Sequence, residues 1–321
     1  WDGLQRYLIG KKHFTQQELL DAGLIIRSDT GRVYDRFRGR LMFPLTNHRG
    51  QTVGFSGRVL EKDAKEAKYI NSPETSLYHK SELLFGFSQL SRFIRQQEEV
   101  IVTEGEFDAL SSYQAHVSNV VAIKGSALTL AHVKLLAKSV KLIILSLDAD
   151  AAGIKATKRA IEVVKESGLD VSLRVVPLVG GKDPDEIARH TPSVWRDMVA
   201  ASTSVYEFLI STAFAAHDSA TGDGKKEITT ELVPVLAGIQ NAVEQTHYIQ
   251  KVAKRLHVSE DVLMQELRKV RFPALATKSM ELAKKPVHKS RAEVLQRYLL
   301  SLLLSSSVTD FPRRYNLMQQ K

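Results

Sequence analysis

Three acidic clusters constrain the fold of this chain more than any other feature. Each begins as a short apolar run suited to a β-strand and ends in carboxylates that precede a helix-like segment. The three stretches are Val100–Asp108, Lys141–Gly153 and Val171–Ile187. Strand–turn–helix units in series form a parallel sheet, and ligands bind outside the carboxyl ends of its strands. We therefore expect an α/β fold in which the carboxylates meet at one sheet edge.

Five of these carboxylates are candidates for a metal site. Clustered carboxylates repel one another unless a cation lies between them, and hard oxygen ligands suit Mg²⁺. The candidates are Glu104, Asp148, Asp150, Asp183 and Asp185. Asp183 has a second interpretation, because an aspartate before Pro184 is also typical of a helix N-cap. The two interpretations are compatible.

Composition excludes several classes of protein. The chain has 321 residues, of which 43% are hydrophobic, so it can bury more than one core. It has no cysteine, which rules out disulfides and a cysteine zinc cluster within it. The longest apolar run, Leu299–Leu304, is far too short for a membrane span, and we expect no signal peptide. Since the first residue is Trp1, we expect a fragment of a longer protein.

The net charge of +9 is unevenly distributed along the chain. Residues 1–95 hold 16 Lys and Arg against 10 Asp and Glu, a net +6, whereas residues 96–270 hold 19 against 23, a net −4. Residues 271–321 hold 10 against 3, a net +7. A basic flank beside an acidic centre suits a protein that holds a polyanion next to bound metal. The alternative is that the basic residues only keep the surface soluble.

The basic charge of the first region is mostly arginine. A guanidinium grips phosphate through two hydrogen bonds and stacks on bases. The sequence Asp35–Arg40 places three arginines at alternate positions, so on a strand they would share one face and favour an anion. Lys68 and Lys80 flank a turn at Asn71–Pro73 and suit phosphate contact, although a single surface lysine usually has no specific role. The arginines are Arg27, Arg32, Arg36, Arg38, Arg40, Arg49 and Arg58.

Patterning divides the chain into four regions: a basic mixed α/β subdomain over 1–95, the metal-binding α/β region over 96–190, a helical bundle over 191–270, and a linker with a truncated domain over 271–321.

In the first region we expect a helical segment over Trp1–Ile26, with Thr15 as a cap. In the third we expect a helix at Val205–Ala216, a polar loop at Asp218–Lys225 and a stretch Ile228–His257 that Pro234 kinks or divides.

The ordered motifs resemble a known family. Glu104–Gly105 after one strand and Asp148-x-Asp150-x-x-Gly153 after another match the Toprim pattern. Tyr34–Pro44, Gly54–Arg58 and Lys68–Thr75 stand in order before that pattern. Together these segments closely resemble the catalytic core of bacterial replicative primases over about residues 1–270. The amphipathic stretch near Arg291 more loosely resembles the start of that family's helicase-binding domain.

The resemblance implies template-directed synthesis of short RNA primers from NTPs on single-stranded DNA. It implies metal binding by Glu104, Asp148 and Asp150, with Mg²⁺ or Mn²⁺ as cofactor, and the further pair Asp183 and Asp185 at the same site. Asp108 would be a structural or supporting residue. The implied partners are the replicative helicase and a zinc-binding domain of the full-length protein, because this stretch itself holds no zinc site. The positions implied to line the nucleotide and template side are Arg38, Arg40, Arg58, Lys68, Asn71 and Lys80.

The sequence departs from the family in places and leaves alternatives open. Lys124 stands where the family has an uncharged residue, and either adds a phosphate contact or is simple variation. Ala149 and Ala151 replace a glycine and a basic residue of the second motif. A Toprim nuclease or topoisomerase would use the same carboxylates to cleave DNA. A non-enzymatic scaffold that binds DNA and recruits the helicase is the other alternative. The implied location is the bacterial cytoplasm, at the replication fork.

Overall fold

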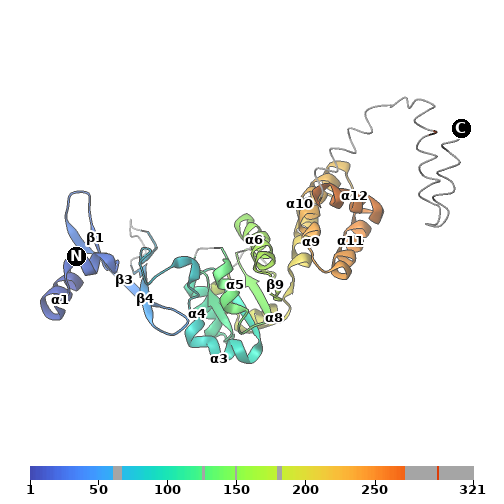
Figure 1. Ribbon diagram of the computed structural model, residues 1–321. Helices are drawn as coiled ribbons and strands as arrows, with labels where there is room; N and C mark the ends of the chain where they lie inside the picture. The colour runs from blue at the N-terminus through green and yellow to red at the C-terminus, as the bar shows by residue number, and fades with distance from the viewer. Residues whose placement is uncertain (61–66, 125–126, 149, 179–182, 272–294, 296–321) are drawn as a thin grey trace, which may run out of the picture. The chain divides into compact units, whose positions relative to one another are not determined.

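The computed structural model describes residues 1–60, 67–124, 127–148, 150–178, 183–271 and 295 (Figure 1). The chain divides into two compact units, Trp1–Leu236 and Ala237–Lys321. The finer boundaries expected at 95/96, 190/191 and 270/271 stay predictions. The amphipathic stretch near Arg291 lies outside the described residues, apart from Leu295. No helix in the described ranges has both the length and the apolar character needed to cross a membrane.

The first residues form two helices and a small hairpin rather than one helical segment. Helix α1 (Gly3–Lys12) ends at His13, whose backbone is left-handed, and α2 (Gln16–Asp21) begins at Thr15. The expected cap is confirmed, because the Thr15 hydroxyl accepts from the Glu18 amide and Glu18 reaches back to the Thr15 amide. The expectation of helix up to Ile26 is wrong: β1 (Ile25–Arg27) pairs antiparallel with β2 (Val33–Asp35).

A three-stranded antiparallel sheet follows. Its strands, in the order β3-β4-β5, are β3 (Arg40–Thr46), β4 (Thr52–Val59) and β5 (Tyr69–Asn71). The prediction that Arg36, Arg38 and Arg40 lie on one strand face is wrong, because β2 ends at Asp35 and β3 begins only at Arg40. The short 3₁₀ helix η1 (Lys80–Glu82) and α3 (Phe87–Gln97) lead to the central sheet.

The central sheet has the order β10-β9-β8-β6-β7. Its strands are β6 (Glu99–Thr103), β7 (Val120–Ala122), β8 (Leu142–Ser146), β9 (Ser172–Val175) and β10 (Thr203–Ser204). The first four in the sequence pair in parallel, as predicted, and β10 adds an antiparallel edge beyond β9. After β6 the chain first adds β7 on one side and then β8 on the other. The loops after β6 and β8 therefore diverge, which makes a topological switch point between these two strands.

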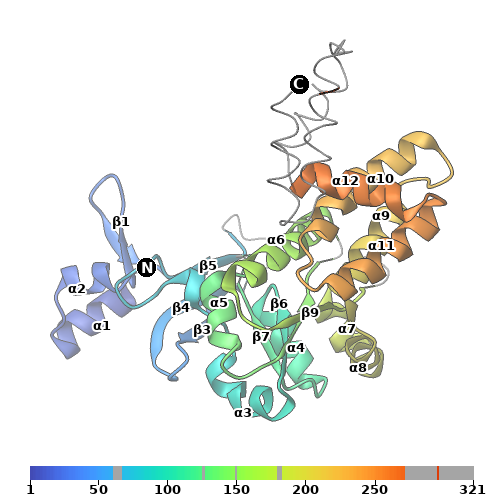
Figure 2. The same ribbon diagram turned by 45° about the vertical axis from the view of Figure 1, so that its right-hand side comes forward.

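Helices cover both faces of this sheet (Figure 2). Because side chains alternate along a strand, Ile143 and Leu145 of β8 pack into one core and Ile144 into the other. The first core is covered by α3, α5 (Leu130–Leu136), α6 (Ala151–Ser167) and α9 (Val205–Ala216). The second is covered by α4 (Glu106–Gln114), α7 (Pro184–His190) and α8 (Pro192–Ala200). Figure 2 shows α5 and α6 on one side of the strands and α4, α7 and α8 on the other.

The remaining helices agree in part with the sequence pattern. Helix α9 has the predicted bounds. The expected loop at Asp218–Lys225 is wrong in its second half, because α10 (Gly222–Ala237) begins there. Pro234 lies inside α10 near its end, and the chain leaves the helix after Ala237. In the second unit, α11 (Ala242–Leu256) starts on an Asn241 cap, and it contacts α12 (Glu260–Arg271).

Candidate functional site

Two carboxylates stand at the switch point of the central sheet. Glu104 follows β6 directly, and Asp148 comes two residues after β8. The two loops touch, because the Glu104 carboxylate accepts a hydrogen bond from the Asp148 backbone amide at 3.1 Å. The first two acidic clusters therefore meet at one edge, as expected from parallel strands that end together.

The second cluster holds its shape through a glycine. Asp150 is the N-cap of α6, and its side chain accepts from the Gly153 amide at 2.8 Å. A Cβ atom at Gly153 would lie only 1.9 Å from the backbone oxygen of Asp148, so no larger residue fits without moving the loop. The spacing Asp148-x-Asp150-x-x-Gly153 thus encodes a tight turn that presents Asp148.

The third cluster joins the first through Asp108. One oxygen of Asp108 accepts from the Gly105 amide at 2.9 Å, and the other accepts from the Asp185 amide at 3.2 Å. Asp185 in turn accepts a hydrogen bond from the Ser111 hydroxyl of α4. Asp183 caps α7, as expected, by accepting from the Glu186 amide at 2.7 Å. Asp108 therefore fixes the start of α4 against the start of α7.

The electrostatics of this edge favour a cation. Burial raises the pKa of Glu104, and the charges of Asp148 and Asp150 raise it further. Burial together with the charges of Asp150 and Asp183 likewise raises the pKa of Asp148. Burial, with Asp183 and Asp148, raises the pKa of Asp108 to about 6. Each carboxylate is thus harder to ionise because of burial and because of its neighbours' charges, and a bound cation would offset that penalty.

These carboxylates form one side of a cleft of about 410 Å³. The other side comes from the three-stranded sheet and η1, which supply Arg58, Lys68, Asn71 and Lys80. The Arg58 guanidinium lies 4.0 Å from the centre of the Phe107 ring and 5.5 Å from that of Tyr69. We call the two sides the acidic side and the basic side. The lining residues are Arg58, Lys68, Tyr69, Asn71, Lys80, Glu104, Gly105, Glu106, Phe107, Asp108, Lys124, Asp148, Asp183 and Asp185.

Three residues of the expected site are not among those that line the cleft. Arg38 is stacked between Trp1 and Tyr34, with its guanidinium 4.5 and 4.6 Å from the ring centres, and donates to the Asp35 carbonyl. The Arg40 guanidinium donates to backbone carbonyls of Gly57 and Ala67. Both arginines thus support the local backbone. The third is Asp150, whose side chain caps α6.

Sequence reasoning missed a buried ion pair in the cleft. The Lys124 ammonium contacts the Glu106 carboxylate, and their side chains are 2% and 7% exposed. Burial works to raise the pKa of Glu106, but the Lys124 charge and the hydrogen bonds from Lys124 and Ser56 bring it below its ordinary value. The only sequence signal was the charged residue at position 124, where the resembled family has an uncharged one.

The carboxylate oxygens on the acidic side suit a divalent cation, although they do not form a complete, preformed coordination shell. In the described ranges, no three Asp, Glu, His or Cys side chains already stand as a group that could hold a metal ion. The available donors are carboxylate oxygens that raise one another's pKa, which suits a hard cation that keeps part of its hydration shell. Residue 149, next to Asp148 in the sequence, and residues 179–182, which precede Asp183 in the sequence, lie outside the described part.

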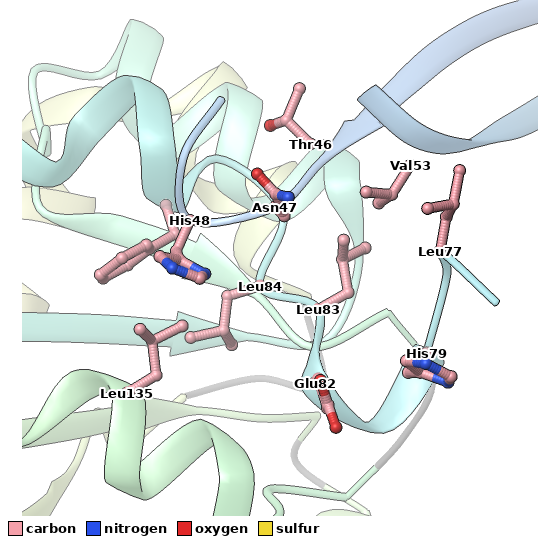
Figure 3. A pocket seen from close by; sticks show the side chains of 11 residues that line it. Thr46, Asn47, His48, Val53, Leu77, His79, Glu82, Leu83, Leu84 and Leu135 are labelled. Carbon is pink, nitrogen blue, oxygen red and sulfur yellow. The ribbon is translucent and has the colours of Figure 1, made fainter. Parts of the chain in front are cut away.

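A second pocket, of about 70 Å³, has a different character (Figure 3). It lies beside the β3–β4 hairpin and is lined by apolar and polar side chains in similar numbers, with two histidines among the polar ones. Figure 3 shows the rings of His48 and His79 on opposite sides of it, with Leu83 and Leu84 between them. This spacing does not bring the two imidazoles together.

Three family models match the chain. "DNA primase catalytic core, N-terminal domain" matches residues 1–91, "Toprim-like" matches residues 101–188, and "DnaB-helicase binding domain of primase" matches residues 206–261. The first two matches fall within the regions 1–95 and 96–190. The third falls on helices that the sequence analysis assigned to a supporting bundle, and not on the stretch near Arg291.

Individual proteins agree with these matches. A DNA primase of Synechococcus elongatus is 37% identical over 266 residues, which are 81% of this chain and 38% of that protein. The crystal structure of a DNA primase domain from Pseudomonas aeruginosa is 33% identical, has a TM-score of 0.69 and is matched over 84% of both chains. The structure of the DnaG primase catalytic domain bound to ssDNA is 28% identical, with a TM-score of 0.68 and coverage of 80% and 81%. The chain spans 38% of the first of these curated relatives and 46% of a DNA primase of Escherichia coli.

Proposed function

Because the chain belongs to the bacterial DNA primase family, we propose that it is the catalytic core of a primase, a DNA-directed RNA polymerase and nucleotidyltransferase that synthesises short RNA primers from NTPs on single-stranded DNA. The observation that carries this proposal is the cleft, which carboxylates at the edge of the central sheet line together with Arg58 of β4, Lys68 just before β5 and Lys80 of η1. Nucleotidyl transfer needs both, because a triphosphate must be held by cations while divalent metal is held by carboxylates.

The acidic side would hold the metal. Glu104, Asp148 and Asp150 are the proposed ligands, with Asp183 and Asp185 beside them, and the cofactor is Mg²⁺, for which Mn²⁺ can substitute. Bound divalent ions stabilise the attacking 3′-hydroxyl oxygen and the leaving pyrophosphate in an in-line displacement. Asp108 orients these proposed ligands, because its carboxylate accepts hydrogen bonds from backbone amides at the starts of α4 and α7. Asp150 has a second task as the cap of α6.

The basic side would hold nucleotide and template. Arg58, Lys68, Asn71 and Lys80 line the same cleft, and the rings of Tyr69 and Phe107 lie beside the Arg58 guanidinium. Basic groups that track a phosphate backbone, together with aromatic faces for stacking, bind single strands without sequence preference. Arg38 and Arg40 contribute indirectly, since they support the backbone of the basic region.

The helical region would connect the core to the replication machinery. Residues 206–261 match the helicase-binding family model, so we assign the replicative helicase as a partner of this region. A zinc-binding domain of the full-length protein would present the template. Primer synthesis by this protein would take place in the bacterial cytoplasm, at the replication fork.

The test is a primer-synthesis assay. The chain is incubated with single-stranded DNA, labelled NTPs and Mg²⁺ or Mn²⁺, with a family zinc-binding domain added in trans. Short RNA products that require both template and metal are expected. Cleaved DNA without RNA would support a Toprim nuclease instead. DNA binding with neither product would support a scaffold that recruits the helicase.

A further inference from the structure

The floor of the cleft contains an ion pair to which neither the family comparisons nor the proposed chemistry gives a role. Lys124 follows β7 and has a left-handed backbone, with φ of 53°. Glu106 is the first residue of α4. Their charged groups are in direct contact and almost completely buried. A buried pair of this kind gains little net stability over an apolar replacement, so stability alone is a weak reason for its presence.

Glu106 also joins the two sides of the cleft. The Ser56 hydroxyl, which is fully buried on β4, donates to the Glu106 carboxylate at 2.6 Å. Ser56 faces Asn71 of β5 in the sheet register. Arg58 lies two residues further along β4 and stacks on Phe107, the residue after Glu106. The strand that carries the basic side is therefore attached to the first two residues of α4.

The same helix start presents the acidic side. Glu104 and Gly105 precede Glu106 directly, and Asp108 holds the Gly105 amide one turn later. Any rotation or shift of the first turn of α4 would move Glu104 relative to Asp148, to which it is hydrogen-bonded. Glu106 thus lies between the groups that contact metal and those that contact phosphate in the proposed reaction.

We propose that Lys124 and Glu106 are positioning residues: as one unit they fix the first turn of α4 against β4, and so set the distance between the metal-binding carboxylates and the phosphate-binding side chains. This inference rests on the proposed function. Lys124 acts by holding the Glu106 carboxylate in place through their direct contact, not by contacting the nucleotide. Removing one member would leave the other charge buried without its partner, so both members must be present or both absent.

The test uses this requirement. Lys124→Met keeps the volume and removes the charge, which leaves Glu106 buried without its cation. The double variant Lys124→Met/Glu106→Gln removes both charges and keeps an acceptor for Ser56. Lys134→Met, at an exposed position of α5, is the matched control. Each protein is measured for Mn²⁺ binding without substrate by electron paramagnetic resonance, for kcat and NTP KM in primer synthesis, and for its thermal unfolding temperature.

We expect Lys124→Met to weaken Mn²⁺ binding and lower kcat by about 10-fold each, because a lone buried carboxylate displaces the turn. The double variant should recover to within about threefold of the original chain in both quantities, since nothing charged is then left unpaired. Lys134→Met should leave both unchanged. If Lys124→Met does not fold, Ser56→Ala serves instead, and a fall in kcat of about threefold with unchanged NTP KM is expected.

Two results would overturn the inference. If Lys124→Met folds and keeps the original kcat and Mn²⁺ affinity, the ion pair has no positioning role and only fills space in the interior. A double variant with normal Mn²⁺ binding but NTP KM as high as in Lys124→Met would make Lys124 a direct phosphate ligand. Failure of the proposed function is separable, because the original chain would then make no RNA while the pattern of Mn²⁺ affinities among the variants would still hold.

Discussion

The acidic and basic sides of the cleft are built in different ways. Glu104 and Asp148 follow neighbouring parallel strands, so their positions depend on chain segments only a few residues long. Arg58 is on β4, Lys68 directly precedes β5 and Lys80 begins η1. They meet only because β4 pairs with β5 and because Arg58 and Tyr69 both contact Phe107 of α4. Sheet topology therefore determines where the acidic residues lie, whereas the positions of the basic residues depend on packing between segments far apart in the sequence.

This difference explains which basic residues reach the cleft. Arg36, Arg38 and Arg40 stand in a segment rich in arginine, yet each donates to a backbone carbonyl, of Asn71, Asp35 and Ala67 respectively. A backbone that leaves one strand and enters another has unpaired carbonyls, and a guanidinium has enough donors to satisfy several. Density of charge in the sequence therefore marks a region, but not the side chains that face the ligand.

The largest effect is expected on the acidic side. Asp148→Ala should lower primer synthesis by about 1,000-fold, because a proposed metal ligand is lost where charge develops in the transition state. The affinity for single-stranded DNA should stay within about twofold, since the basic side is untouched. Synthesis assays and fluorescence anisotropy with a labelled oligonucleotide measure the two quantities.

A control distinguishes charge from folding in that experiment. Partial burial and the charges of neighbouring carboxylates raise the pKa of Asp148, so its removal should not lower the thermal unfolding temperature of the metal-free chain. Synthesis at the original rate would show that Asp148 is not a metal ligand. It would also contradict the proposal that the acidic side binds metal while the basic side binds nucleotide and template.

The next effect compares two arginines of the basic region. Arg58→Ala should weaken DNA binding by about 10-fold and reduce the slope of log affinity against log salt by about one, as for a lost phosphate contact. Arg40→Ala should leave the slope unchanged and instead lower the unfolding temperature, because carbonyls of Gly57 and Ala67 lose their donor. Anisotropy at several salt concentrations and thermal unfolding measure both. Equal salt slopes for the two variants would contradict the division between cleft-lining and supporting arginines.

Sequence patterns predicted the parts of the site that depend on local rules. Parallel strands that end in Glu104 and Asp148 and an N-cap at Asp183 follow from short segments and were expected before the fold was known. The pairing of Glu106 with Lys124 and Ser56 was not, because the three residues lie 18 and 50 positions apart and meet only when β4, β7 and α4 pack together. The division of labour among the arginines required the same long-range information.

The smallest expected effect concerns Asp108, which joins two of the acidic clusters. Its pKa is raised from 3.8 to about 6, mainly by burial and then by the charges of Asp183 and Asp148. A raised pKa in the folded state means that the contribution of Asp108 to stability is present below pH 4 and is lost as the pH rises through about 6. A shift of this size corresponds to about 2–3 kcal/mol at most. Asp108→Asn lacks this titration, so in the metal-free chain its unfolding temperature relative to the original should rise by a few degrees between pH 4.5 and pH 8.

Thermal unfolding in EDTA across this pH range measures that difference, and Asp197→Asn, at an exposed position of α8, controls for the loss of one carboxylate. Saturating Mn²⁺ should shrink the difference at pH 8, because a cation on the acidic side removes the repulsion that raises the pKa of Asp108. A difference that does not change with pH would mean that Asp108 is ionised throughout. In that case the negative charge of the acidic side would already be stabilised without metal, despite its burial and its neighbouring carboxylates. The acidic side would then need a cation less than proposed, and its contrast with the basic side would be weaker.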